Sequence, residues 1–504
     1  MIKNFENIKT LGQLKKSGYK LKSIKDEMRE NLISLLKNKE KQFTDIIGYD
    51  ETVIPDIQSA ILSRHNIILL GLRGQAKTKI ARSLVNLLDE YIPVIAGSEI
   101  NDDPLHPISR FGKDKVEEYE DDTTIDWIHR NERYAEKLAT PDVTIADLIG
   151  DVDPIKAAAL KLPYSDERVI HFGIIPRSHR GIFVINELPD LQARIQVALF
   201  NILQEKDVQI RGFKIRLPLD VQFVFTANPE DYTNRGSIVT PLKDRIDSQI
   251  LTHYPRTISV SKNITQQEAK LTKEQKENIH VSELIKNLIE QIAFKARESE
   301  YVDSKSGVSA RLTISAFENI ISTAERRILI NTEKETDIRI SDFVGVIPAI
   351  TGKVELVYEG EQEGPAKVAQ ILLGKAIKED FAHYFPSPEK SKKKKDEPNP
   401  YQEIITWFSS GNKVDLLNNL TNEEYKRILC SIPGLSKLVM KYHPEAPESE
   451  KYLLMEFLLH GLSEHSLLSK YHIEFGFQFK DMLSSMFTLN SDDDDEEFDE
   501  EKYM

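Results

Sequence analysis

Residues 66–78 read Asn66-Ile67-Ile68-Leu69-Leu70-Gly71-Leu72-Arg73-Gly74-Gln75-Ala76-Lys77-Thr78, a short apolar strand that runs directly into a glycine-containing loop. Gly71 and Gly74 let the backbone turn so that N–H groups point at phosphate oxygens. Lys77 brings a positive charge for the β and γ phosphates, and Thr78 brings a hydroxyl for Mg²⁺. The segment predicts a triphosphate-binding loop; the alternative is a strand-to-helix turn without a ligand.

One position departs from the Walker A pattern, because Ala76 stands where the last glycine is expected. A methyl group there costs little if the local φ is negative and clashes if φ is positive. The sequence leaves both conformations open.

Composition places the chain among ordinary soluble proteins. It has 504 residues, of which 40% are hydrophobic and 29% charged, enough for about three domains. Its single cysteine, Cys430, excludes an internal disulfide and a cysteine metal cluster, and favours a reducing compartment. No segment approaches the roughly 18 consecutive apolar residues of a membrane span, and none resembles a signal peptide. We therefore expect a cytoplasmic protein.

Residues 44–258 alternate short apolar runs with amphipathic stretches, which is typical of an α/β fold with parallel strands covered by helices on both faces. We expect a five-stranded parallel sheet, preceded by a helical leader over 1–43. The expected strands are 67–70, 92–95, 181–185, 221–226 and 249–254. Residues 97–180 are longer than a simple crossover needs, which predicts insertions, and residues 208–217 alternate around an Arg-Gly turn, as in a β-hairpin.

The second half is predicted to be mainly helical. Residues 259–385 show helical spacing of apolar residues and are expected to form a helical lid. Residues 386–400 are polar and proline-broken and predict a linker. Residues 401–490 predict a C-terminal all-α module. The tail, 491–504, holds nine of the carboxylates behind the net charge of −14, and we expect it to be disordered.

The strand over 181–185 ends in Asn186-Glu187, where a Walker B pair is expected at the carboxyl edge of the sheet. Glu187 is the candidate for orienting and partly deprotonating the attacking water. A helix-capping carboxylate is the alternative for Glu187. Asn186 stands where an aspartate would hold the Mg²⁺ hydration shell, so the sequence predicts weaker Mg²⁺ binding or slower turnover.

Three further polar residues follow in order. Asn228 ends the next expected strand, where it can touch the γ-phosphate or the lytic water. Arg245 precedes the last strand and would act on a neighbouring subunit's site in a ring. Arg311 opens a lid helix and can reach phosphates. Each is by itself a common surface or capping residue, and their order after Lys77 and Glu187 is what favours a catalytic role.

The series GLRGQAKT (71–78), GIFVINEL (181–188), FVFTANPED (223–231), LKDRID (242–247) and GVSARL (307–312) resembles the AAA+ ATPases of the MoxR and magnesium-chelatase motor-subunit group. The resemblance covers about residues 44–350. It implies a helix-2 insertion in 97–180 and a pre-sensor-1 hairpin at 208–217. It also implies that Asn228 is sensor 1, Arg245 the arginine finger and Arg311 sensor 2, and that an alanine in the phosphate loop is familiar.

The same resemblance implies ATP and Mg²⁺ as cofactors, with Thr78 and Asn186 on the metal side. It implies a homo-oligomeric, hexameric ring and a partner that carries a von Willebrand factor A domain. The nucleotide-binding residues would be Ile47, Gly48, Gly71, Arg73, Gly74, Gln75, Ala76, Lys77 and Thr78.

These features favour a chaperone-like ATPase that remodels or activates a protein complex. One alternative is the motor subunit of a chelatase that inserts Mg²⁺ into a porphyrin. Another is a nucleotide-gated scaffold with weak hydrolysis, which Asn186 favours. A nucleic-acid motor has the least support, because the basic residues of the hairpin come without an aromatic stacking series and the protein is acidic.

Overall fold

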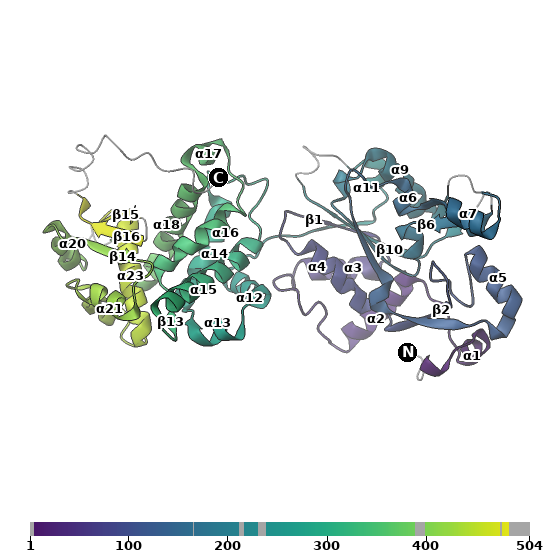
Figure 1. The fold of residues 1–504 in the computed structure, drawn as a ribbon, viewed down its shortest axis with the longest axis horizontal. Helices are drawn as coiled ribbons and strands as arrows, with labels where there is room; N and C mark the ends of the chain where they lie inside the picture. Colours follow the sequence, from purple (N-terminus) through teal and green to yellow (C-terminus); the bar gives the residue numbers. More distant parts are fainter. Residues whose placement is uncertain are drawn as a thin grey trace. The chain divides into compact units, whose positions relative to one another are not determined.

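The computed structural model describes residues 5–164, 166–210, 216–229, 238–388, 399–473 and 476–482. The predicted acidic tail, most of the predicted linker and the hairpin tip lie outside these residues. Contacts divide the chain into two compact units, Met1–Tyr254 and Pro255–Met504, which Figure 1 colours from purple to blue-green and from green to yellow. Among the described residues, no helix is both long enough and apolar enough to cross a bilayer.

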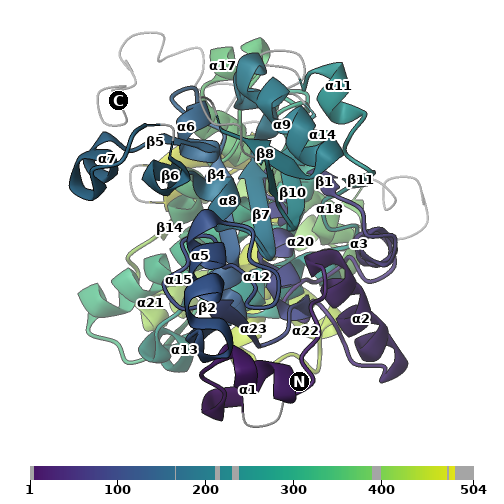
Figure 2. The same ribbon diagram turned by 90° about the vertical axis from the view of Figure 1, so that its right-hand side faces the viewer.

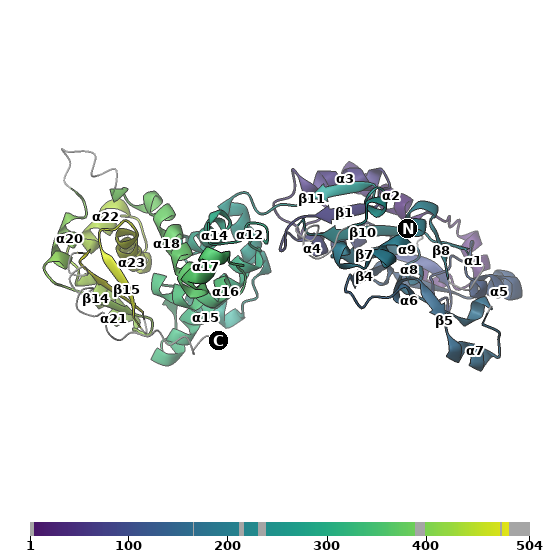
Figure 3. The same cartoon turned by 90° about the horizontal axis from the view of Figure 1, so that it is seen from above.

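The first unit is built on a five-stranded parallel sheet, as predicted. Its strands run in the order β11-β1-β10-β7-β4, which Figures 2 and 3 show from two sides. They are β1 (Ile67–Leu70), β4 (Tyr134–Leu138), β7 (Gly181–Asn186), β10 (Val221–Ala227) and β11 (Ser248–Leu251). The carboxyl ends of β1, β10 and β7 therefore lie side by side.

One strand of the prediction was misplaced. Residues 92–95 do form a strand, β2 (Tyr91–Ile95), but it pairs antiparallel with β3 (Ile125–His129), outside the main sheet. The edge of the main sheet is taken by β4, which the sequence analysis missed. Its residues Tyr-Ala-Glu-Lys-Leu are only partly buried, so it lacks the continuous apolar run of a central strand. Pro93 fits the two-stranded pair, since proline is tolerated at sheet edges.

Helices cover both faces because alternate strand residues point to opposite sides. On one face, Ile67, Leu69 and Val184 pack with α2 (Ile24–Lys37), α3 (Val53–Leu62), α4 (Lys77–Ser83) and η2 (Leu84–Leu87). On the other face, Ile68 and Phe183 pack with α6 (Ile145–Leu148), α8 (Ile174–Arg177), α9 (Ala193–Glu205) and α11 (Thr240–Lys243). The predicted α/β core is confirmed.

The long region before β7 contains small elements instead of one crossover. They are α5 (Arg110–Tyr119), η3 (Glu120–Asp122), η4 (Arg130–Arg133), β5 (Gly150–Val152), α7 (Pro154–Leu160), η5 (Glu167–Val169) and β6 (Ile170–Phe172). Strands β5 and β6 pair antiparallel around α7. The hairpin predicted after α9 also forms, with β8 (Asp207–Gln209) paired antiparallel to β9 (Arg216–Pro218).

The N-terminal leader is fixed to this unit by buried charge pairs. It comprises η1 (Phe5–Asn7), α1 (Leu11–Lys16) and α2. Glu27 of α2 accepts two hydrogen bonds from Arg133, at 2.7 and 2.6 Å, and both side chains are almost fully buried. Arg180 similarly pairs with Asp103 at 3.0 Å and donates to the Tyr19 hydroxyl at 2.8 Å. The leader is therefore part of the α/β unit's interior.

The second unit is mainly helical. Its helices in the lid region are α12 (Ile258–Glu268), α13 (Lys273–Asn278), α14 (Glu283–Glu298), α15 (Arg311–Asn331), η7 (Ile340–Val346), α16 (Ile347–Thr351), α17 (Tyr358–Glu363) and α18 (Pro365–Tyr384), with short paired strands β12 (Ile279–His280) and β13 (Thr336–Asp337). Its C-terminal helices are α20 (Gln402–Ser409), α21 (Asn422–Cys430), α22 (Leu435–Tyr442) and α23 (Glu448–Glu464).

The C-terminal module is helical, as predicted, but it is not all-α. It also holds an antiparallel sheet in the order β14-β16-β15, formed by β14 (Val414–Leu417), β15 (Ser469–Ile473) and β16 (Gly476–Lys480). These strands are short and mix polar with apolar residues, so they give no continuous apolar run. The sheet packs on α23, whose residues 453–462 are all buried.

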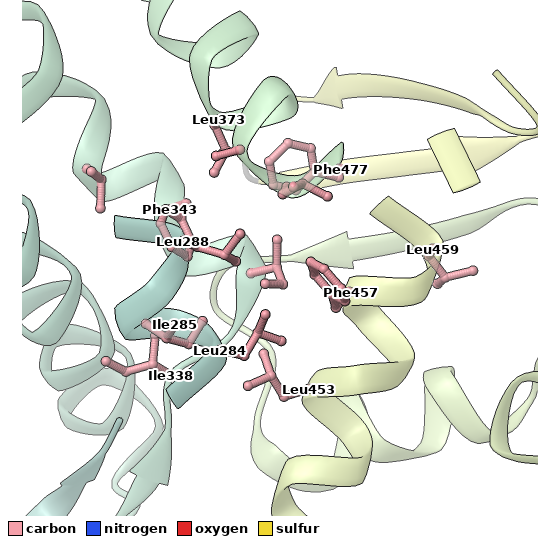
Figure 4. Close-up of a cluster of buried hydrophobic side chains, with 14 of the residues drawn as sticks. Leu284, Ile285, Leu288, Ile338, Phe343, Leu373, Leu453, Phe457, Leu459 and Phe477 are labelled. Atoms are coloured by element: carbon pink, nitrogen blue, oxygen red, sulfur yellow. The ribbon is translucent and has the colours of Figure 1, made fainter. Parts of the chain in front are cut away.

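The lid and the C-terminal module share one hydrophobic core. Leu284 and Leu288 of α14 belong to the same buried cluster as Phe457 of α23 and Phe477 of β16, and Figure 4 shows these side chains together. Glu456 crosses the same boundary, because its carboxylate accepts the backbone N–H groups of Ile340 (2.8 Å) and Ser341 (2.9 Å). Residues before and after the predicted linker thus fold as one compact unit.

Replacing Glu27 by glutamine is expected to destabilise the first unit by about 3 kcal/mol, because it leaves the Arg133 charge buried without its counter-ion. Denaturant unfolding followed by Trp127 fluorescence measures this, in a Trp407→Phe background that removes the second tryptophan of the chain. The control is Glu30→Gln, which breaks the exposed Lys22–Glu30 pair and is expected to cost under about 1 kcal/mol. Equal effects of the two variants would contradict the prediction.

The first unit is also expected to lose stability in mild acid through His179. Burial, with a smaller contribution from the Arg180 charge, lowers the pKa of His179 to about 3. Between the unfolded pKa of about 6.5 and that value, the unfolded chain binds the extra proton, so stability falls by up to about 1.4 kcal/mol per pH unit as the pH drops.

His179→Asn provides the matched variant, because the asparagine oxygen can accept the Asp220 N–H that now donates to His179 Nδ1 at 3.0 Å. Unfolding followed by Trp127 at pH 7.5 and pH 5 should show a smaller loss in the variant than in the parent. The same loss in both proteins would rule out His179 as its source.

Candidate functional site

The predicted phosphate loop joins β1 to α4 and adopts two left-handed backbone positions. Gly74 has φ +73° and Ala76 has φ +58°. Ala76 therefore takes the conformation that the sequence analysis identified as the costly one, and its methyl group carries about 1 kcal/mol of strain. Gly71 is needed for a different reason, since a Cβ there would lie 2.0 Å from Thr252 Oγ1 and 2.2 Å from Gln75 Oε1.

Lys77 and Asn228 meet in this loop, although they are far apart in the sequence. The Lys77 ammonium donates to Asn228 Oδ1 at 2.7 Å, to the Leu72 carbonyl at 3.0 Å and to the Gly71 carbonyl. The parallel register of β1 with β10, which pairs Leu70 with Ala227, brings the two residues to the same edge. The structure thus joins the predicted lysine and the predicted polar residue in one place.

The loop is anchored from β11 and from the segment before α3. Gln75 is buried and its Oε1 accepts the Thr252 hydroxyl at 2.7 Å. The Tyr49 hydroxyl lies 3.0 Å from the Gln75 carbonyl and 2.7 Å from the His253 carbonyl. Ile47 and Gly48 directly precede Tyr49, and Gly48 has φ +84°; their contact with the nucleotide stays a prediction. Arg73 is exposed, and its carbonyl accepts the Tyr254 hydroxyl at 3.0 Å.

The Asn186-Glu187 pair ends β7 at the same edge. Glu187 has φ +57°, so the chain turns sharply after the strand. The buried Thr226 of β10 fixes this turn, because its Oγ1 accepts the Glu187 N–H at 3.1 Å and donates to Asn186 Oδ1 at 3.3 Å. Sequence reasoning missed Thr226. The available signal was its position, because a polar residue one place before the end of a buried strand lies next to the expected site.

A second carboxylate reaches Asn186 from the neighbouring strand. Glu136 of β4 accepts hydrogen bonds from Arg82 of α4 and from the Tyr134 hydroxyl, the latter at 2.8 Å. The hydrogen bond from Arg82, with further ones from Tyr134 and Asn186, holds the pKa of Glu136 below its ordinary value. Sequence reasoning missed Glu136, because nothing local indicates that β4 lies beside β7.

The two candidate arginines are placed differently. Arg245 follows α11, where it donates to Gln204 Oε1 at 2.9 and 3.1 Å and to the Pro241 carbonyl at 2.6 Å, and its guanidinium lies over the Phe200 ring. It is half-buried on its own subunit. Arg311 begins α15 in the second unit, and its N–H donates to Ser309 Oγ at 3.1 Å. The roles of both residues stay predictions.

The donor set at this edge suits a hard cation. Thr78 is exposed in the first turn of α4, and the oxygens of Asn186 and Glu187 end the strand that lies two places away in the sheet. Hydroxyl, amide and carboxylate oxygens are the ligands or water-binding groups that Mg²⁺ uses beside a phosphate. Within the described ranges no group of three or more His, Cys, Asp and Glu residues is arranged to hold a metal by itself. The residues fit a cation that arrives with a nucleotide.

Comparisons with known proteins agree with this architecture. The family model described as Sigma-54 interaction domain matches residues 163–249. Magnesium-chelatase subunit ChlI-2 of Arabidopsis thaliana is 24% identical over 241 residues, which cover 47% of this chain and 54% of that protein. The chain thus spans about half the length of this relative. Magnesium-chelatase subunit ChlI of Euglena gracilis is 23% identical over 326 residues, which cover 60% of this chain and 87% of that protein.

Solved structures that align with this chain include a RuvB mutant from Thermotoga maritima, at 11% identity and a TM-score of 0.35, covering 81% of this chain and 99% of that chain. A second is the complex between subunits BchI and BchD of magnesium chelatase, at 16% identity and a TM-score of 0.33, covering 64% of this chain and 98% of that chain.

Thr226→Val is expected to destabilise the first unit by about 1 kcal/mol, because the partly buried Glu187 N–H loses its acceptor. Thr226→Ser keeps the hydroxyl and serves as the control, with a cost below that of the valine. Denaturant unfolding followed by Trp127 compares the two variants. Equal stability of the valine variant and the parent would show that the hydroxyl does not hold this turn.

Proposed function

We propose that this chain is an AAA+ protein of the magnesium-chelatase ChlI-like group and an ATP-hydrolysing motor that remodels or activates a protein complex. The membership in the MoxR branch stays a prediction. The observation that carries the proposal is the meeting of Lys77 with Asn228 in the loop after β1, beside the Asn186-Glu187 turn. Such a site combines phosphate binding with a carboxylate that can act on water.

In this proposal the loop residues bind and the strand-end residues act. The backbone of 71–78 receives the phosphates and Lys77 contacts their β and γ oxygens. Glu187 orients a water and draws off its proton, while Asn228 holds the γ-phosphate or that water in line. Mg²⁺ bound with the nucleotide would neutralise charge on the phosphates, with Thr78 and Asn186 on its side of the site.

Ring assembly and the partner are also part of the proposal. Arg245 is half-buried and donates to Gln204 and the Pro241 carbonyl of its own subunit, so serving a neighbour's site would require it to exchange these contacts. We infer a homo-oligomer, a hexamer by family likeness, with Arg311 contacting the nucleotide from the lid. A partner with a von Willebrand factor A domain would carry the force to the client. A relative's printed description as a subunit of magnesium chelatase supports assembly with other proteins.

A specific observation supports a second candidate, a nucleotide-gated scaffold with weak hydrolysis. Asn186 stands in place of the aspartate that normally adds negative charge beside Mg²⁺. The motor subunit of a chelatase is a third candidate function. It is less well supported, because such a motor does not need the helical module after residue 400. The two leading candidates differ in turnover, which separates them by experiment.

Lys77→Ala is expected to weaken binding of a fluorescent ATP analogue by roughly 100-fold, because it removes the charge that contacts the phosphates. Lys79→Ala, two residues along the same helix, is the control and should bind as the parent does. Glu187→Gln should bind nucleotide while phosphate release falls by about 10²–10⁴-fold. These are measured on the purified full chain.

The outcomes separate the readings. Turnover in the parent that Glu187→Gln abolishes supports the motor. Absent turnover in the parent that Asn186→Asp restores supports the scaffold. A parent that binds no ATP or ADP at millimolar concentration contradicts both.

A further inference from the structure

The missing Walker B charge has a candidate replacement on the neighbouring strand. In the parallel register of β4 with β7, Glu136 lies opposite Val184 and Leu138 lies opposite Asn186. Paired residues of parallel strands point to the same side, and residues two apart on one strand do as well. Glu136 and Asn186 therefore face the same side of the sheet, the side covered by α4, the helix that follows the phosphate loop.

The two side chains are diagonal neighbours on this face, and the Asn186 amide is among the groups that lower the pKa of Glu136. An ionised carboxylate can only accept hydrogen bonds, so the end of the amide that favours the charged Glu136 is its N–H₂. The amide oxygen is then left on the side of Thr226, whose hydroxyl donates to it at 3.3 Å. Glu136 thus fixes which end of the amide faces the other strand ends.

The partner of Glu136 also belongs to the phosphate-loop helix. Arg82 lies one helical turn after Thr78 on α4, so both residues share one face of that helix. The Arg82 side chain is 61% exposed and that of Glu136 29% exposed. An ion pair this exposed is worth at most about 1 kcal/mol, so Arg82 can leave Glu136 at little cost. Both residues line an open surface hollow of about 460 Å³, so water can reach the carboxylate.

We propose that Glu136 is a positioning residue that supplies, through Asn186, the negative charge missing from the Mg²⁺ side of the site. The amide presents its oxygen to the metal-bound water, and the carboxylate behind it polarises the amide and adds the charge. This inference rests on the proposed function. It gives a residue of the edge strand β4 the role that an aspartate at the end of β7 would otherwise have, namely to supply negative charge beside Mg²⁺.

The competing explanation is structural. Glu136 could serve only to pair with Arg82 and Tyr134 and so hold α4 against β4. In that case, removing either member of the ion pair would have the same effect, since both variants break the same contact. The charge explanation predicts opposite behaviour, because only the loss of Glu136 removes negative charge.

The test is a titration of Mg²⁺ against binding of a fluorescent ATP analogue by the full chain, with EDTA as the zero point. Glu136→Gln should raise the Mg²⁺ concentration for half-maximal tightening by roughly five- to tenfold, as expected for losing one charge a few ångströms beyond the first shell. Affinity in EDTA should stay as in the parent. Arg82→Gln should leave the midpoint unchanged or lower it.

A double variant gives the rescue. Glu136→Gln combined with Asn186→Asp moves the charge to the end of β7 and should return the midpoint to within about twofold of the parent. A midpoint unchanged by Glu136→Gln, one raised equally by Arg82→Gln, or a failed rescue overturns the inference while leaving nucleotide binding intact. A parent that binds no nucleotide overturns the proposed function itself, and the inference with it.

Discussion

The parallel register between β1 and β10 is the constraint on which the site depends. Pairing Leu70 with Ala227 makes the two strands end at the same level, so the loop that follows β1 and the residue that follows β10 meet. The Lys77 ammonium then lies 2.7 Å from Asn228 Oδ1. A slip of one residue would turn each side chain to the other face and separate them. The buried apolar side chains on both faces of the strands prevent that slip.

Much of this arrangement could be predicted from the sequence, because the central strands are buried on both faces. Residues 181–185 and 223–225 are continuous apolar runs, and polar residues of the site come directly or shortly after them, Asn186 after the first and Asn228 after the second. The edges could not be predicted in the same way. The strand β4 carries Glu136 and Lys137 and is half exposed, so its composition does not distinguish it from a loop, and β2 has the apolar composition of a core strand without its position. The sheet after residue 400 was missed for the same reason.

Site residues divide along the same line. Lys77, Asn186, Glu187 and Asn228 could be proposed from the sequence because each follows a strand that the sequence predicts. Thr226 and Glu136 were not predicted. Each acts on a residue of a neighbouring strand, and the order of the strands in the sheet cannot be predicted from local composition. Ala76 was recognised as unusual, but its conformation could not be assigned, because an alanine is compatible with either sign of φ.

Two of the left-handed non-glycine positions of the first unit lie at the proposed site. Ala76 and Glu187 both have φ near +58°, a conformation that costs a residue with a Cβ about 1 kcal/mol. Such positions persist only where surrounding contacts fix them. The Thr226 hydroxyl oxygen accepts a hydrogen bond from the Glu187 N–H. The Tyr49 hydroxyl donates to the carbonyl of Gln75, the residue before Ala76. Both contacts come from other elements of the α/β unit, so the fold itself maintains the two turns. The two turns follow β1 and β7 at the carboxyl edge of one sheet, so contacts within the α/β unit hold the backbone on which the proposed site is built.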